Sequence, residues 1–261
     1  MSKRRLALRR ALQTALAGYR RHPWQLLGFS AAAVGLHLLG WALFAAADLN
    51  DSGVLGLLLH AVGIAVYGGS LLWLLEGLSR AGLAVTAGRR LRWRALCRWP
   101  GPRSWPLACG LINLAVALVV TALSGFVAWS LVLYLLPALQ VLPVLLAVVA
   151  GVAVMLSQLF NSCLVLEAGL SPSAAFRQGF LLLERHWAGL LSLGAALCGL
   201  LLSPLLLGLL SEGLLPGCGV AATGLGLLAV LPLAANSVAA AYRQLETEPS
   251  PSGAPLSGSD R

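Results

Sequence analysis

The chain has 261 residues, of which 59% are hydrophobic and only 10% are charged, and its formal net charge is +9. Average soluble domains are about 45–50% apolar and about 25% charged, so this composition excludes an ordinary soluble fold and indicates that lipid surrounds most of the chain. The basic residues flank long apolar runs, which argues against nucleic acid as the partner and indicates contact with anionic phospholipid.

Residues 1–22 are basic and carry a helical pattern of apolar side chains. This pattern predicts a helix that lies on the membrane surface, and a frayed basic tail is the alternative. The apolar stripe of this helix consists of Leu8, Leu12, Ala15, Leu16 and Tyr19.

Pro23 and Trp24 end that helix and begin the first apolar span, residues 24–47. A helix rises about 1.5 Å per residue, so a span of this length crosses the roughly 30 Å of hydrocarbon in a bilayer. Residues 48–53 form a predicted turn without a basic residue, and residues 54–78 form the second span.

Residues 80–105 contain seven arginines and no acidic residue. Glu76 and Arg80 lie four residues apart at the end of the second span and can pair on one helix face. Every fourth residue from Arg90 to Arg98 is an arginine, so in a helix these residues would form one charged stripe, which the following prolines would end. We expect five arginines of this segment to contact anionic lipid: Arg89, Arg90, Arg92, Arg94 and Arg98.

Residues 105–136 are apolar throughout and would form a helix of ~48 Å, which is longer than a bilayer requires. Either one helix protrudes, or the helix breaks near Ser124 and Gly125. Pro137 and Pro143 are predicted to bracket a turn, after which a fourth span runs to about Leu166 and is closed by Glu167.

The third part of the chain begins with Ser171 and Pro172, a pair that is typical of a helix start. Aromatic and leucine residues at helical spacing between residues 176 and 187 predict another surface helix. Residues 187–210 and 220–241 are the last two spans. Residues 246–261 are rich in proline, serine and glycine and are predicted to be a disordered cytoplasmic tail.

Three similar units follow from this pattern, covering about residues 1–79, 80–168 and 169–245 of one membrane domain. Each has a basic segment, a tryptophan and two apolar spans, and the marker residues Trp24, Trp105 and Trp187 are 81 and 82 residues apart. With six spans, all eighteen lysines and arginines fall on one side. The positive-inside rule then predicts that both termini of this inner (plasma) membrane protein are cytoplasmic.

Five polar residues lie within or near the predicted spans. Hydrogen bonds between helices explain such residues, at about 0.6–2 kcal/mol each, and a substrate path is the alternative. These intramembrane candidates are His37, His60, Asn113, Asn161 and Asn236.

Motifs for catalysis or metal binding are missing from the sequence. The five cysteines form no CxxC pair, and no histidine accompanies one at zinc-ligand spacing. There is also no hydrolase elbow, phosphate-binding loop, HExxH motif or pair of carboxylates. We therefore expect no enzyme activity, no metal and no cofactor.

Three stretches resemble the bacterial membrane-domain family that occurs fused to glycerophosphodiester phosphodiesterases, together with its stand-alone relatives. The resemblance covers almost the whole chain and implies a fold and a membrane location, but no activity, because no phosphodiesterase domain is attached. The stretches are Tyr19-Arg-Arg-His-Pro-Trp24, Ala174-Ala-Phe-Arg-Gln-Gly-Phe180 with Glu184-Arg-His-Trp187, and Ala240-Ala-Tyr-Arg-Gln-Leu245.

The sequence thus predicts an all-α, six-span integral membrane protein with surface helices. Its expected role is that of a non-catalytic scaffold or assembly partner that contacts anionic lipid and a membrane protein. A small transporter or permease subunit is the alternative, and a membrane-bound enzyme comes third. A water-accessible cavity holding His37, Asn113 or Asn161 would favour transport, whereas a packed interior beside an exposed apolar groove would favour the scaffold.

Overall fold

The computed structural model describes residues 6–49, 53–98, 104–135 and 137–246. Over these residues the chain is 90% helical and has no strand, and six helical segments are long and apolar enough to cross a membrane. The predicted all-α, six-span class is therefore confirmed. The six segments are α2 (Pro23–Asp48), α3 (Gly53–Thr86), α5 (Ser104–Leu135), the segment Pro137–Leu166, α8 (Pro172–Leu214) and α9 (Cys218–Glu246).

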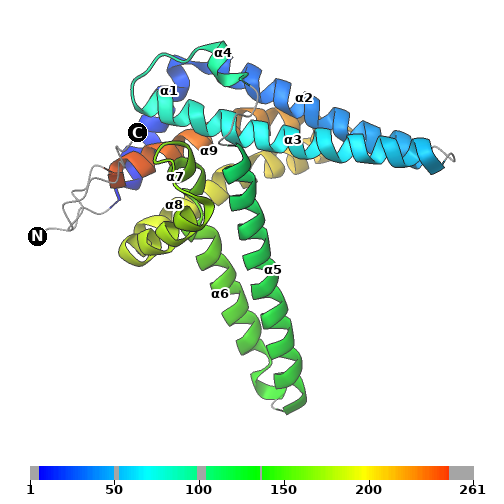
Figure 1. Cartoon of the computed structure of the whole chain (residues 1–261), viewed down its shortest axis with the longest axis vertical. Helices are drawn as coiled ribbons and strands as arrows, with labels where there is room; N and C mark the ends of the chain where they lie inside the picture. Colours follow the sequence, from blue (N-terminus) through cyan, green and yellow to red (C-terminus); the bar gives the residue numbers. More distant parts are fainter. Residues whose placement is uncertain (1–5, 50–52, 99–103, 136, 247–261) are drawn as a thin grey trace, which may run out of the picture.

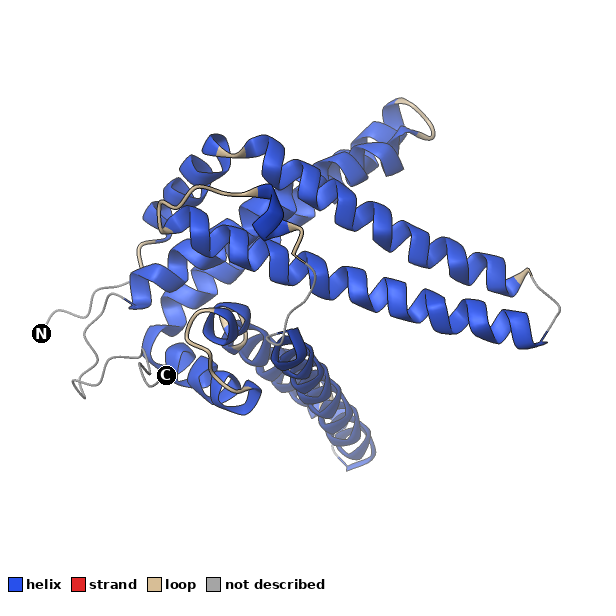
Figure 2. Cartoon of the chain, turned by 45° about the horizontal axis from the view of Figure 1, so that its top comes forward, coloured by secondary structure: helices blue, strands red, loops and turns tan. Residues whose placement is uncertain are grey.

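The long helices form three antiparallel hairpins that diverge from a common region (Figure 1). Helix α2 pairs with α3, α5 pairs with α6 (Val141–Ser157), and α8 pairs with α9. Figure 2 shows that the tips of the three hairpins point in different directions. We call the region where they meet the hub, and it also contains the short helices α1 (Leu8–Arg21), α4 (Trp93–Leu96) and α7 (Asn161–Leu166).

The buried core of the protein lies in the hub. One cluster joins side chains from α1, α3, α7, α8 and the end of α9, including Phe160, Leu190 and Ala239. A second cluster, around Phe29 and Leu26, joins α2, α3 and the segment with α4. By contrast, no residue in the most apolar stretch of α5 is buried. The spans therefore pack mainly in pairs, and their other faces are open to lipid or to a partner.

Helix α5 settles one alternative that the sequence left open. It runs without interruption from Ser104 to Leu135, so the predicted break near Ser124 and Gly125 does not occur. Gly125 instead lies where α5 meets α6, and a methyl group added there would overlap the side chain of Ala147. The glycine serves a close helix contact, which small residues favour in membranes.

The fourth span departs from its prediction, because it is not one continuous helix. A short 3-10 turn, Pro137–Leu139, precedes α6, and Pro143 lies in the first turn of α6 instead of in the loop before it. The helix then breaks after Ser157 and resumes as α7. The backbone carbonyl of Ser157 lies against Gly179 of α8, where an added methyl group would overlap it.

A helix is present where the third surface helix was predicted, at the start of α8. A kink at His186, whose backbone angles are φ −129° and ψ 26°, separates it from the fifth span, so α8 consists of two helices. The predicted start is confirmed, because Pro172 is the first residue and Ser171 Oγ accepts a hydrogen bond from the Ala174 N–H at 3.4 Å. His22 has a similar conformation, φ −137° and ψ 45°, where α1 gives way to α2.

The central basic segment does not form the predicted helical stripe. Helix α3 continues to Thr86 and ends at Gly88, which has φ +70°, a conformation that favours glycine. Only Arg94 of the stripe lies in a helix, the four-residue α4. The predicted disordered tail lies outside the described residues, except for Glu246, which is the last residue of α9.

Candidate functional site

The five predicted lipid-contacting arginines all lie on the surface of the hub. They belong to the segment that connects α3 to α5, and each is exposed. Leu91 and Leu96 are buried and anchor this segment, while the ring of Trp93 lies over Gly28 at the start of α2. Among the described residues, none of the five guanidinium groups forms an ion pair. The segment thus presents a row of free cations: Arg89, Arg90, Arg92, Arg94 and Arg98.

The three marker tryptophans lie at the hub end of the three hairpins and are strongly exposed. The exposed fractions of Trp24, Trp105 and Trp187 are 83%, 73% and 64%. Tryptophan is enriched where a protein surface passes from hydrocarbon to headgroups, because its ring is apolar and its N–H is polar. The hub ends of the three hairpins thus each carry an exposed amphipathic ring.

A buried carboxylate joins the first hairpin to the second. Glu76 of α3 is only 1% exposed and forms an ion pair with Arg80, as the spacing of four residues predicted. Its second oxygen accepts a hydrogen bond of 2.7 Å from the hydroxyl of Ser104, the first residue of α5. Both carboxylate oxygens have bonding partners, so Glu76 has a structural role in linking α3 to α5.

A second ionic cluster joins α7 to the end of α9. Arg243 pairs with Glu167 and also with Glu246, where Nη1 and Oε2 are 3.1 Å apart. Burial raises the pKa of Glu167 above its ordinary value, although Arg243 and the nearby Arg89 oppose this shift. The sequence could not predict the whole cluster, because Glu167 is far from Arg243 and Glu246 along the chain and only the fold brings it to them.

The two predicted histidines bind α2 to α3. His37 Nδ1 lies 3.2 Å from the hydroxyl of Ser70, and its ring lies on that of Tyr67 with centroids 3.9 Å apart. His60 Nδ1 lies 3.0 Å from the carbonyl oxygen of Gly56, and its Nε2 lies 3.2 Å from Asp48. Both rings therefore have partners within one hairpin, as expected of structural histidines.

The three predicted asparagines lie in different environments. Asn161 is buried in the hub against Gly110 of α5, and its carbonyl oxygen has no hydrogen-bond partner among the described residues. Asn236 is completely buried in α9, and neither its amide nitrogen nor its amide oxygen has a hydrogen-bond partner among the described residues. Asn113 is exposed on α5. Among the described residues, no hydrogen bond joins these asparagines to one another or to His37.

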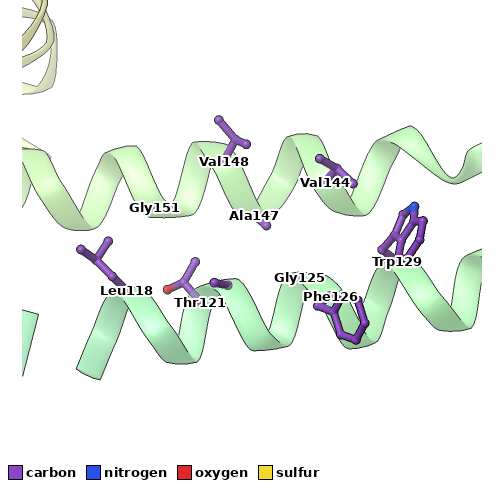
Figure 3. A pocket seen from close by; sticks show the side chains of 10 residues that line it. Leu118, Thr121, Gly125, Phe126, Trp129, Val144, Ala147, Val148 and Gly151 are labelled. Atoms are coloured by element: carbon purple, nitrogen blue, oxygen red, sulfur yellow. The ribbon is translucent and has the colours of Figure 1, made fainter. Parts of the chain in front are cut away.

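An apolar groove runs between α5 and α6, and sequence reasoning missed it (Figure 3). Its volume is about 500 Å³. Trp129 reaches from α5 toward Val144 of α6, and nothing lies within 4 Å of a methyl group added at Gly151. The hydroxyl of Thr121 donates to the carbonyl oxygen of Ala117 at 2.7 Å, so it presents no free donor. The groove is lined by Leu118, Thr121, Ala122, Gly125, Phe126, Trp129, Val144, Ala147, Val148 and Gly151.

No family model, curated protein or solved structure matches this chain. The resemblance to the membrane domain found with glycerophosphodiester phosphodiesterases therefore stays a prediction. Function has to be argued from the hub, its arginines and the groove.

Proposed function

We propose that the protein is a non-catalytic scaffold in the inner membrane of a bacterium. Its groove between α5 and α6 receives an apolar transmembrane helix of a partner protein, and the arginines of its hub hold anionic phospholipid. The observation that carries this proposal is the groove, because it is hollow and apolar and few residues of the two spans that form it are buried.

The shape and chemistry of the groove fit a helix of a membrane protein. Association of helices in lipid depends on close packing, and small residues permit it. Ala122 and Gly151 supply such residues along the groove, and Leu118 and Trp129 supply larger side chains between which an incoming helix can pack. The lining residues belong to two membrane-spanning segments, so the occupant must itself be stable in hydrocarbon.

The distribution of charge supports an orientation with the hub in the cytoplasm. The described arginines lie in α1, in the segment between α3 and α5, and in the parts of α3, α8 and α9 nearest the hub, whereas the far ends of two hairpins carry Asp48 and Glu212. Positive residues remain on the cytoplasmic side during insertion, and each one near an anionic leaflet contributes about 1 kcal/mol to lipid contact. This distribution of charge supports the proposal that both termini are cytoplasmic.

The positions of the polar residues support a scaffold over a transporter. A transport path would gather polar side chains around one mid-membrane site. Here His37 is bonded within the first hairpin, Asn161 packs in the hub, and Asn113 lies on the outer surface of α5.

Photocrosslinking from the groove tests the proposal. Val148 lines the groove and Val149 does not, yet their exposed fractions are 57% and 58%. With p-benzoylphenylalanine at each position in turn, we expect Val148 to capture a transmembrane segment of one protein and Val149 to capture far less. Mass spectrometry of the crosslinked peptide identifies the segment.

Two glycine variants make this test specific. Nothing lies within 4 Å of a methyl group added at Gly151 or at Gly199, but only Gly151 lines the groove. Gly151→Leu should fill the hollow and lower the capture from Val148, and Gly199→Leu should leave it unchanged. Equal capture from Val148 and Val149, or capture of lipid alone, would contradict the proposed role of the groove.

A further inference from the structure

The side chain of Asn113 is a polar group placed on the lipid-facing surface of a span. It is exposed on α5, and among the described residues no hydrogen bond to its amide is formed. It lies eight residues after the interfacial Trp105, which corresponds to about 12 Å along the helix, near the middle of a roughly 30 Å hydrocarbon core. An amide without a partner at this depth is costly, because hydrocarbon offers it no hydrogen bond.

Two other polar side chains of α5 form hydrogen bonds within the helix. The hydroxyl of Thr121 donates to the carbonyl oxygen of Ala117 at 2.7 Å, and the hydroxyl of Ser130 donates to that of Phe126 at 2.9 Å. Asn113 makes no such bond, so its partner must come from outside the described part of the chain.

Asn113 belongs to a stripe that has the spacing of a helix-pairing surface. Its members recur at alternating steps of four and three residues, the pattern of a left-handed helix pair. The stripe shares no residue with the lining of the groove between α5 and α6. We call it the Asn113 seam, and it consists of Asn113, Ala117, Val120, Ser124, Val127 and Leu131.

The partner that best fits this seam is a second copy of the same chain. A carboxamide carries both a donor and an acceptor, so two asparagines can satisfy each other. Two copies inserted in one membrane share their orientation, and Asn113 of each copy therefore lies at the same depth. A two-fold axis along the membrane normal then brings the two seams together in a contact that is identical from both sides.

We infer that the protein forms a dimer through the Asn113 seam of α5, with the two Asn113 side chains hydrogen-bonded near the middle of the membrane. This inference goes beyond the proposed scaffold role and does not depend on it. The seam and the groove lie on different faces of α5, so either surface can fail its test without the other.

Disulfide crosslinking of the full chain in membranes tests the contact. The five native cysteines are replaced by alanine, and a single cysteine is placed at Val120 or at Val119, whose exposed fractions are 55% and 56%. Val120 lies in the seam and Val119 does not. Oxidation should yield a crosslinked dimer for Val120→Cys and little for Val119→Cys. Equal crosslinking at both positions, or none at Val120, would overturn the inference.

An amide-deletion variant tests the role of Asn113 itself. One intramembrane hydrogen bond should change the dissociation constant of the dimer about 3- to 30-fold, so Asn113→Val should weaken it by this factor. Energy transfer between labelled copies in vesicles of increasing lipid content measures the constant. Thr121→Val is the matched control and should change nothing, because the Thr121 hydroxyl is bonded within its own helix. An unchanged constant for Asn113→Val would refute the amide pair, whatever the crosslinking shows.

Discussion

Single glycines decide how closely the helices of the hub approach one another. At Gly179 of α8 an added methyl group would overlap the backbone carbonyl oxygen of Ser157, and at Gly82 of α3 it would lie 3.0 Å from the carbonyl oxygen of Ala235. Backbone atoms cannot rotate away as a flexible side chain can. These glycines therefore permit close contacts that hold the break between α6 and α7 against α8, and α9 against α3.

Gly179→Ala should destabilise the protein by roughly 1–3 kcal/mol, because overpacking at a backbone contact forces the helices apart. Gly199→Ala in the same helix is the matched control, since nothing lies within 4 Å of its added methyl group. It should be neutral or stabilise by up to about 1 kcal/mol through helix propensity. Thermal unfolding in a mild detergent compares the two variants. Equal unfolding midpoints would show that the contact between Gly179 and Ser157 does not contribute to stability.

The sequence predicted local pairs of residues and missed the distant ones. Glu76 and Arg80 are one turn apart, so helix geometry alone predicted their ion pair. Arg243 and Glu167 belong to different hairpins, and only the fold makes them neighbours. The polarity of Asn113 was evident from the sequence, but its exposure was not, because the direction of a side chain depends on which face of the helix is packed.

The helices themselves were largely predictable, and their ends and breaks were not. Apolar length alone located the six spans, because a bilayer fixes how long a span must be. No proline lies at the break after Ser157, so the sequence does not indicate it. At this break the carbonyl oxygen of Ser157 packs against Gly179 of α8. The groove between α5 and α6 likewise required knowledge of which faces pack, since glycine and alanine are common on every face of these helices.

The sequence predicted α1 as a helix but not which of its residues are buried. The amphipathic pattern correctly predicted a helix. Its buried residues, however, are Ala11, Ala15 and Gly18, whereas Leu16 of the predicted stripe is 38% exposed. Small residues face α9 and α3 because they allow close approach, and the larger leucine remains available to lipid.

The whole molecule is a hub from which three hairpins extend, and its charge is concentrated at the hub (Figure 1). The proposed orientation places the hairpin tips outside the cytoplasm. Single cysteines at Leu49 and Leu214, which are 87% and 81% exposed, should react with an impermeant reagent in intact cells lacking the native cysteines. A cysteine at Gly88 in the hub should react only after the membrane is opened. Labelling in the opposite order would reverse the orientation.

In the proposed function, the hub is a cytoplasmic surface that binds anionic lipid through its central arginines. Native mass spectrometry of lipid bound to the purified protein tests this claim most directly. We expect a lower affinity for anionic lipid, by at least about tenfold, when five arginines are changed to glutamine: Arg89, Arg90, Arg92, Arg94 and Arg98. A tenfold loss of affinity corresponds to less free energy than five arginines supply at about 1 kcal/mol each. The same five positions changed to lysine should retain the lipid, since the charge is kept. Unchanged retention in the glutamine variant would contradict the account.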